Sequence, residues 1–307
     1  MEATVLCKSE CILGEGPLWL PGTQKLMWVD IERSRLYEHD WRQRTARHWQ
    51  LDKRVTLVLP LQQSGQLLIG MQGGAAIFDP ANGQYQWLAD IEKEMPTHRC
   101  NDGAFDAQGR LWAGSMCTSL QPGQGSLYML GKDLSLHKKI SRLAIPNGIV
   151  WSRDNTRMYF IDSNQRCVQC YRFDAETGDI TFEKVAVDIP PLMGSPDGMT
   201  MDEEGMLWIA HYGGYGVYRW NPLTGELLEK VSLPVPNVTS CVFGGPDLDV
   251  LFITTARQEL GEDALRQYPD SGNVFYVQTK VKGLPTNAGA FGAPGGAAVQ
   301  ALLRTGV

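Results

Sequence analysis

The stretch FDAQGRLWAG (105–114) joins a short apolar run to an apolar strand through a polar turn that carries glycine. Five other stretches repeat this pattern: PLWLPGTQKLMWVD (17–30), VLPLQQSGQLLIG (58–70), WSRDNTRMYFID (151–162), MDEEGMLWIA (201–210) and VFGGPDLDVLFIT (242–254). Their matching strand positions are spaced by 41, 44, 47, 49 and 44 residues: Leu26, Leu67, Leu111, Met158, Leu207 and Leu251. A period of this length, filled with strand and turn signals, is typical of a radial array whose units hold about four strands each. The sequence therefore predicts an all-β protein, a six-bladed β-propeller with four-stranded antiparallel blades.

The repeats fill the chain as one domain, although a length of 307 residues alone would suggest about two. We expect this domain to span residues 1–284. The ring would be closed by pairing of the N-terminal strand, around ATVLCKS (3–9), with the last blade. Residues 285–307 are rich in glycine and alanine, so we expect a C-terminal tail with little contact with the core.

Composition narrows the possible partners. The net charge of −6 disfavours a nucleic-acid binder, whose affinity depends on clustered Lys and Arg. No apolar run is long enough to span a bilayer, and the N-terminus has no apolar segment of the signal-peptide type. The seven cysteines indicate reduced thiols, so we expect a cytoplasmic protein. We expect a small-molecule ligand, no nucleic-acid or membrane partner, and a monomer or weak homodimer.

A polar residue lies ten or eleven positions before each matching strand position. All six carry a side-chain oxygen: Glu15, Thr56, Asn101, Asn147, Asp197 and Ser240. In a propeller this position starts the innermost strand, so the six would form a ring around one mouth of the central channel. Pro-Asn-Gly and Pro-Asp-Gly surround two of them, the proline stiffening and the glycine freeing the backbone. The alternative interpretation is that Asn-Gly and Asp-Gly are ordinary turn formers.

Glu15, Asn147 and Asp197 supply two carboxylates and an amide oxygen. Such hard oxygen ligands suit Ca²⁺, Mg²⁺ or Mn²⁺, and carboxylates also accept Zn²⁺. Two carboxylates buried together without a cation would be unfavourable. We therefore expect one divalent cation on the propeller axis, with Ca²⁺ as the first candidate.

Several motifs in a fixed order resemble the SMP-30/gluconolactonase family over nearly the whole chain. They are LGEGPLW (13–19), HRCNDGAFDAQGRLWAG (98–114), IPNGIVWS (145–152), YFIDS (159–163), SPDGMTMDEEGMLWIA (195–210) and TSCVFGG (239–245). The resemblance implies a propeller that holds one divalent cation and hydrolyses sugar lactones to aldonic acids. It also implies that Glu15, Asn147 and Asp197 bind the metal, that Arg99 and Asn101 contact substrate, and that Asp197 is the catalytic acid/base.

One position departs from this family. Ser119 stands where mammalian members carry a glutamate that reaches the sugar, so their sugar preference does not transfer to this chain.

Other interpretations remain open. Arg99 could be a structural ion-pair partner. The same metal site would also suit a phosphotriesterase, or a calcium-binding propeller without turnover, and a rim that binds a protein would need no metal. The spacing of Cys167 and Cys170 on a strand argues against a zinc or redox pair. For His211 we expect a hydrogen bond at the rim, and for Asp30 and Asp162 we expect structural turns.

Overall fold

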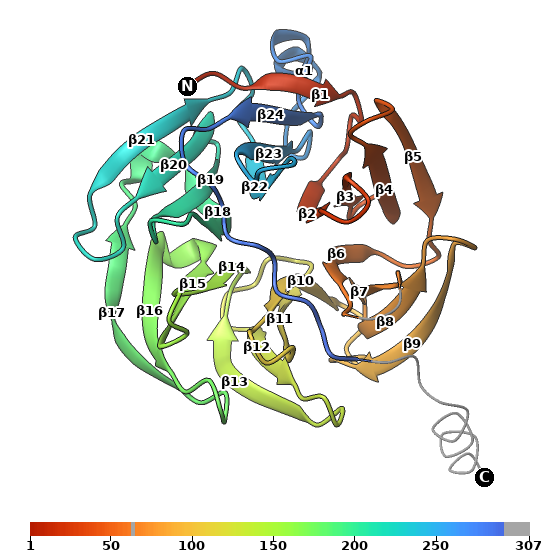
Figure 1. Ribbon diagram of the computed structural model, residues 1–307, viewed down its shortest axis with the longest axis vertical. Coiled ribbons are helices and arrows are strands. Elements are labelled where there is room, and N and C mark those ends of the chain that lie inside the picture. Colours follow the sequence, from red (N-terminus) through yellow and green to blue (C-terminus); the bar gives the residue numbers. More distant parts are fainter. Residues whose placement is uncertain (63–64, 292–307) are drawn as a thin grey trace.

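Six four-stranded antiparallel sheets surround a central axis (Figure 1). The structure, a computed structural model, describes residues 1–62 and 65–291. The repeat in the sequence is the second strand of each sheet with the turn before it, and each sheet is one blade. The all-β, six-bladed propeller predicted from the repeat is therefore confirmed.

In each of the first five blades the strands run outward in chain order. Blade 1 is β2 (Gly14–Leu20), β3 (Lys25–Asp30), β4 (Arg35–Asp40) and β5 (Thr45–Gln50); blade 2 is β6 (Val55–Pro60), β7 (Leu67–Met71), β8 (Gly74–Asp79) and β9 (Gln84–Asp90). Blade 3 is β10 (His98–Phe105), β11 (Leu111–Cys117), β12 (Gly125–Leu130) and β13 (Leu136–Leu143); blade 4 is β14 (Pro146–Trp151), β15 (Arg157–Asp162), β16 (Cys167–Phe173) and β17 (Ile180–Asp188). Blade 5 is β18 (Ser195–Met201), β19 (Leu207–Tyr212), β20 (Gly216–Trp220) and β21 (Leu227–Ser232).

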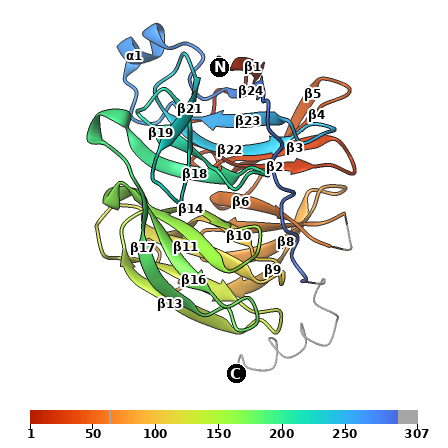
Figure 2. The ribbon, with the colours of Figure 1, turned by 60° about the vertical axis from the view of Figure 1, so that its left-hand side comes forward.

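Blade 6 is built from both ends of the chain. It contains β22 (Val238–Gly244), β23 (Val250–Thr255), β24 (Val274–Gln278) and, at its outer edge, β1 (Thr4–Cys7). β1 runs antiparallel to β24, with Thr4 opposite Tyr276, and Figures 1 and 2 show the pair at the rim of the disc. Opening the ring at this blade would therefore require breaking a strand pair.

In residues 1–62 and 65–291, three short helical elements lie outside the sheets. They are the 3₁₀ helices η1 (Ser163–Gln165) and η2 (Pro191–Met193), and the helix α1 (Glu262–Gln267). None of the helices in the described part of the chain combines the length and the hydropathy needed to cross a lipid bilayer.

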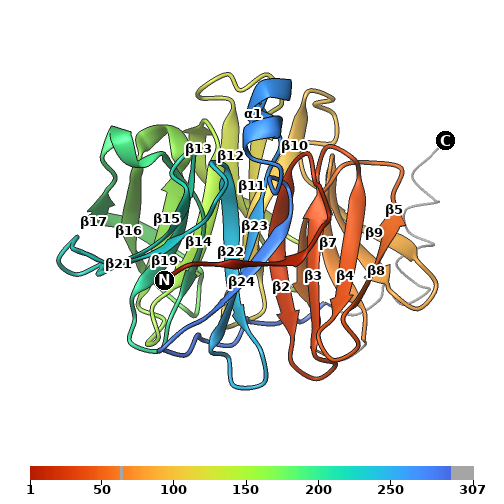
Figure 3. The same ribbon diagram turned by 90° about the horizontal axis from the view of Figure 1, so that it is seen from above.

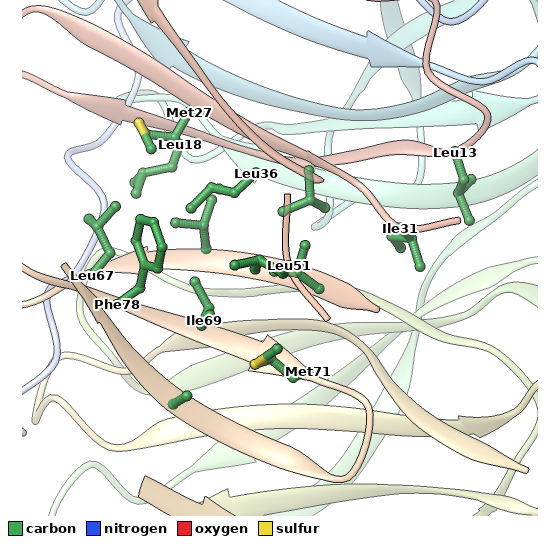
Figure 4. Packing of buried hydrophobic residues seen from close by; sticks show 14 of the residues in the cluster. Leu13, Leu18, Met27, Ile31, Leu36, Leu51, Leu67, Ile69, Met71 and Phe78 are labelled. Carbon is green, nitrogen blue, oxygen red and sulfur yellow. The ribbon is translucent and has the colours of Figure 1, made fainter. Parts of the chain in front are cut away.

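The core is divided into clusters that fill the spaces between neighbouring blades. Between blades 1 and 2, Leu18 and Met27 pack in the same cluster as Ile69 and Phe78 (Figure 4). The second strands of blades 1, 3 and 5 each contain a fully buried tryptophan: Trp28, Trp112 and Trp208. Each such burial contributes about 1.5–3 kcal/mol. These tryptophans pack between neighbouring blades, because each belongs to a core cluster that two blades share.

The turn within the repeat is held by a buried aspartate. In blade 5, Asp202 accepts hydrogen bonds from the backbone N–H of Met206 (2.9 Å), from Trp208 Nε1 (2.9 Å) and from Arg219 Nε (2.8 Å). Asp106 has equivalent partners in blade 3, including Trp112 Nε1 at 2.9 Å. This recurring set of bonds explains why the Asp–x–x–Gly turn is repeated with a tryptophan after it.

The segment after β24 crosses the ring, and here the structure differs from the expected loose tail. Figure 1 shows it passing the centre of the disc, and Figure 3 shows it on the face opposite α1. Gly289 donates from its N–H to the Pro60 carbonyl at 2.9 Å, and Phe291 is buried against Phe105. A Cβ on Gly289 would lie 2.2 Å from the Phe105 ring, so glycine is what allows this approach. Residues 292–307 lie outside the described residues.

All seven cysteines lie within the described residues, and all are free thiols. Cys167 and Cys170 are both buried in β16.

Candidate functional site

The inner strands of all six blades are irregular where the polar ring residues lie. Each pairs with its neighbour through a shifted register, between Glu15 and Leu18 in blade 1 and at the matching place in the other five. Such bulges re-aim a side chain relative to the sheet. The six ring residues are between 1% and 8% exposed. The position picked out by the repeat is therefore a distinct structural position in every blade.

The glycines that follow Asn147 and Asp197 do not provide the backbone freedom that was expected of them. Gly148 and Gly198 do not adopt positive φ angles. A Cβ on Gly198 would lie 2.1 Å from Ser240 Oγ, and one on Gly148 would lie 2.6 Å from the Met199 Cβ. Glycine is needed at both positions because neighbouring inner strands approach closely around the axis.

Glu15 and Asp197 form the acidic part of the site. Their carboxyl groups lie within hydrogen-bonding reach of each other although they come from blades 1 and 5. Burial raises the pKa of both groups well above the ordinary range. The negative charge of Asp102 raises the pKa of Glu15 further, and that of Glu15 raises the pKa of Asp197. Burial and the mutual repulsion of the two carboxylates therefore favour a protonated form of the pair when no cation is bound.

Asn101 and Asn147 connect blades 3 and 4 beside this pair. Asn101 Nδ2 donates to the Pro146 carbonyl at 2.8 Å and to Asn147 Oδ1 at 2.9 Å. Asn147 Nδ2 in turn donates to Ser163 Oγ at 2.7 Å. Both amide hydrogens of Asn101 are thus used within the protein, and its Oδ1 is the atom it can offer to a ligand.

Arg99 has donors that the protein does not use. Its Nη1 donates to the Cys100 carbonyl at 3.0 Å and to Asn101 Oδ1, whereas Nε is buried without a partner. No ion pair within residues 1–62 and 65–291 includes Arg99, so it is not a structural ion-pair partner there. Burial lowers the pKa of Arg99 to about 10, which leaves it charged at neutral pH.

Three residues at the ends of second strands hold the loops that lead into the site. Asp30 accepts hydrogen bonds from the N–H groups of Ile12 and Leu13, which precede Glu15 in the sequence. Asp162 accepts them from the N–H groups of Ala144 and Ile145, which precede Asn147. His211 is fully buried and its Nδ1 lies 2.8 Å from the Met193 carbonyl, ahead of Asp197. Burial lowers its pKa to about 4, so His211 is neutral. All three have the structural roles expected of them.

Two of the ring residues do not join the site, and one other residue was missed. Thr56 Oγ1 donates to the Gly70 carbonyl in its own blade at 3.3 Å. Ser240 instead lines an axial cavity of about 400 Å³ that lies between the inner strands and residues 284–287. Asp102 lines the same cavity and is a third carboxyl group near Glu15 and Asp197. The feature that could have identified Asp102 from the sequence is its place directly after the ring residue Asn101.

Ser119 is exposed on the loop after β11, and its Oγ lies 3.0 Å from Cys117 Sγ.

The residues present fit a hard divalent cation. Within the described residues, no lysine, arginine or histidine forms an ion pair with the buried Glu15 or Asp197, and Asn147 Oδ1 keeps one lone pair beyond its bond from Asn101. Within the described residues, no three His, Cys, Asp or Glu side chains are grouped as a metal site. A cation held here would therefore depend on the amide oxygen of Asn147 as well as on the two carboxylates.

Comparison with known proteins agrees with this geometry. Residues 13–257 match the model of the family described as the SMP-30/Gluconolactonase/LRE-like region. The Bacillus subtilis protein YvrE, to which a sugar lactone lactonase activity is provisionally assigned, is 32% identical over 92% of this chain and 97% of its own. Regucalcin of Bos taurus is 34% identical over 91% of this chain and 97% of its own.

A crystal structure of a calcium-binding protein, regucalcin, from Agrobacterium tumefaciens superposes with a TM-score of 0.89. The two chains are 29% identical, and the match covers 94% of this chain and 97% of the other.

Proposed function

This chain belongs to the SMP-30/gluconolactonase/LRE-like family, and we propose that it is a divalent-metal-dependent hydrolase that opens sugar lactones to aldonic acids. The observation that carries the proposal is the buried Glu15–Asp197 pair, whose charges interact with the Arg99 guanidinium. Asn147 is joined through Ser163 to the carbonyl of Pro196, the residue before Asp197. Such a set can hold a cation and a neutral, oxygen-rich substrate together.

Glu15, Asn147 and Asp197 would hold the cation. When bound, it would polarise the lactone carbonyl and stabilise the negative charge that develops on the carbonyl oxygen. Calcium is the first candidate because the Agrobacterium relative is described as a calcium-binding protein, and Zn²⁺, Mn²⁺ and Mg²⁺ are the alternatives.

Asp197 would act as the acid/base. As water attacks the carbonyl carbon, Asp197 accepts the proton that the water loses, and the ring C–O bond breaks. The same proton then goes to the ring oxygen, which becomes a hydroxyl group of the aldonic acid. Arg99 would donate from its guanidinium group to the carbonyl or to a sugar hydroxyl, and Asn101 Oδ1 would accept from a hydroxyl.

The test is acid release from a panel of aldonolactones, followed with a pH indicator. Chelator-treated protein is compared with protein supplied with Ca²⁺, Mn²⁺, Mg²⁺ or Zn²⁺. We expect cation-dependent turnover that Asp197→Ala lowers by at least about 100-fold, whereas Asp247→Ala, at an exposed carboxylate, leaves it unchanged. Absence of turnover on every lactone, with a cation bound, would refute the proposal.

A calcium-binding role without turnover is the second candidate. It is favoured by the relatives named regucalcin and by the Agrobacterium protein described as calcium-binding. Calorimetric titration with Ca²⁺ is combined with assays of lactone and phosphotriester hydrolysis to separate the two candidates. Calcium binding without hydrolysis of either substrate class would support this candidate alone.

A further inference from the structure

We propose that Ser163 is a positioning residue that orients the two cation-site residues Asn147 and Asp197. Ser163 lies at the start of η1, between β15 and β16 of blade 4, and is 8% exposed. This role rests on the proposed function, because it concerns the same cation site. It follows from the direction of each hydrogen bond around Ser163.

The hydroxyl group of Ser163 has one hydrogen, and the structure determines where it goes. Ser163 Oγ lies 2.6 Å from the Pro196 carbonyl oxygen. A carbonyl oxygen only accepts, so the hydroxyl hydrogen lies on this contact. At the other contact, 2.7 Å from the Asn147 amide, Ser163 Oγ must therefore accept. The amide atom facing Ser163 is thus Nδ2, and Asn147 Oδ1 is turned away from it.

Arg99, at the other end of this series of hydrogen bonds, requires the same orientation of the Asn147 amide. Arg99 only donates, so the Asn101 atom that faces Arg99 Nη1 is Oδ1. Asn101 Nδ2 then faces the Pro146 carbonyl and Asn147, and it donates to both. The atom of Asn147 that receives this bond is again Oδ1. The orientations of the Asn101 and Asn147 amides are therefore set by a group that only donates at one end, Arg99, and by a carbonyl that only accepts at the other.

The same serine also links two blades at the site. Pro196, whose carbonyl accepts from Ser163, lies in β18 of blade 5 and directly precedes Asp197. One hydroxyl group thus holds the amide of Asn147 and the backbone next to Asp197. Without it, the buried Asn147 Nδ2 loses its acceptor, and the amide oxygen is no longer held in the direction that suits a cation.

Four variants test this role by calorimetric titration of chelator-treated protein with Ca²⁺ and Mn²⁺. We expect Ser163→Ala to weaken cation binding by about 10–100-fold, the usual effect of losing a group that orients a ligand. Ser163→Thr keeps the hydroxyl group and should remain within about threefold of the wild type. Ser163→Cys keeps the size but accepts weakly, so it tests the same point if the alanine variant does not fold.

Thr279→Val is the matched control. Thr279 is 7% exposed, and its hydroxyl oxygen lies 2.7 Å from the Val281 carbonyl and 2.8 Å from the Asp249 carbonyl, away from the site. It should lower the thermal stability of the cation-free protein about as much as Ser163→Ala does, and leave cation affinity unchanged. If Ser163 is a positioning residue, Ser163→Ala therefore loses cation affinity, whereas Thr279→Val loses a similar amount of thermal stability but no cation affinity.

Two results would overturn the inference, and they are distinguishable. If the wild type binds Ca²⁺ or Mn²⁺ and Ser163→Ala or Ser163→Cys binds it within about twofold, Ser163 has no orienting role and the proposed function stands. If the wild type binds no divalent cation, the proposed cation site fails and the role of Ser163 fails with it.

Discussion

Replacement of Asp102 by asparagine should stabilise the cation-free protein, but only where Asp102 is ionised. Asp102 lies in β10, lines the axial cavity and accepts a hydrogen bond from the Gly103 N–H at 2.7 Å. Burial raises its pKa to about 6. An exposed aspartate in the unfolded chain titrates near a pKa of about 4.

The sign and size of the effect follow from these two pKa values. Between pH 4 and 6 the folded protein binds more protons than the unfolded chain, so its stability falls as the pH rises. The difference corresponds to a loss of about 3 kcal/mol, complete above the folded pKa. With an unfolding entropy of about 0.6 kcal/mol per kelvin for a chain of this length, that is a change in Tm of about 5 °C.

The assay is urea and thermal unfolding of chelator-treated protein at pH 4 and pH 7.5. We expect Asp102→Asn to match the wild type at pH 4 and to exceed it by about 3 kcal/mol at pH 7.5. Asp247→Asn, which removes an exposed carboxylate, should change neither value by more than about 0.5 kcal/mol. The chelator is needed because a bound cation would favour the ionised form of Asp102.

Two outcomes would refute this reasoning. An equal effect of Asp102→Asn at both pH values would show that the carboxyl group is not the source of the pH dependence. A variant less stable than the wild type at pH 7.5 would show that the ionised group is stabilised by a partner in the folded protein.

Three further predictions follow from other contacts. Asp202→Ala should lower the free energy of unfolding by about 3 kcal/mol, measured in urea, because the mostly buried Arg219 loses a partner. Gly198→Ala should weaken Ca²⁺ binding in calorimetry, since its Cβ would meet Ser240, whereas Gly22→Ala, with open space around it, should not. Chelation of divalent cations should lower Tm more at pH 8 than at pH 5, because the carboxyl pair is protonated at low pH; an equal loss at both would contradict this.

The sequence determined the architecture because its signals are local and recur six times. The turn around Asp202 and the tryptophan after it sit within a few residues of each other, so one blade can be recognised without knowledge of its neighbours. The same regularity singled out Glu15, Asn147 and Asp197 as candidates, because they occupy equivalent positions in the inner strands of their blades. The roles expected of Arg99 and Asn101 come from the resemblance to a family and stay predictions.

Tertiary structure decided what depends on contacts between blades. Ser163 and Pro196 lie 33 positions apart, and Asn147 Oδ1 accepts its hydrogen bond from Asn101 of the neighbouring blade. The close packing that requires glycine at position 198 also exists only once the ring is closed. Asp102 acquires its raised pKa through burial in the channel. Repeat spacing fixes which residues face the axis, whereas their partners, protonation and orientation arise from the assembled ring.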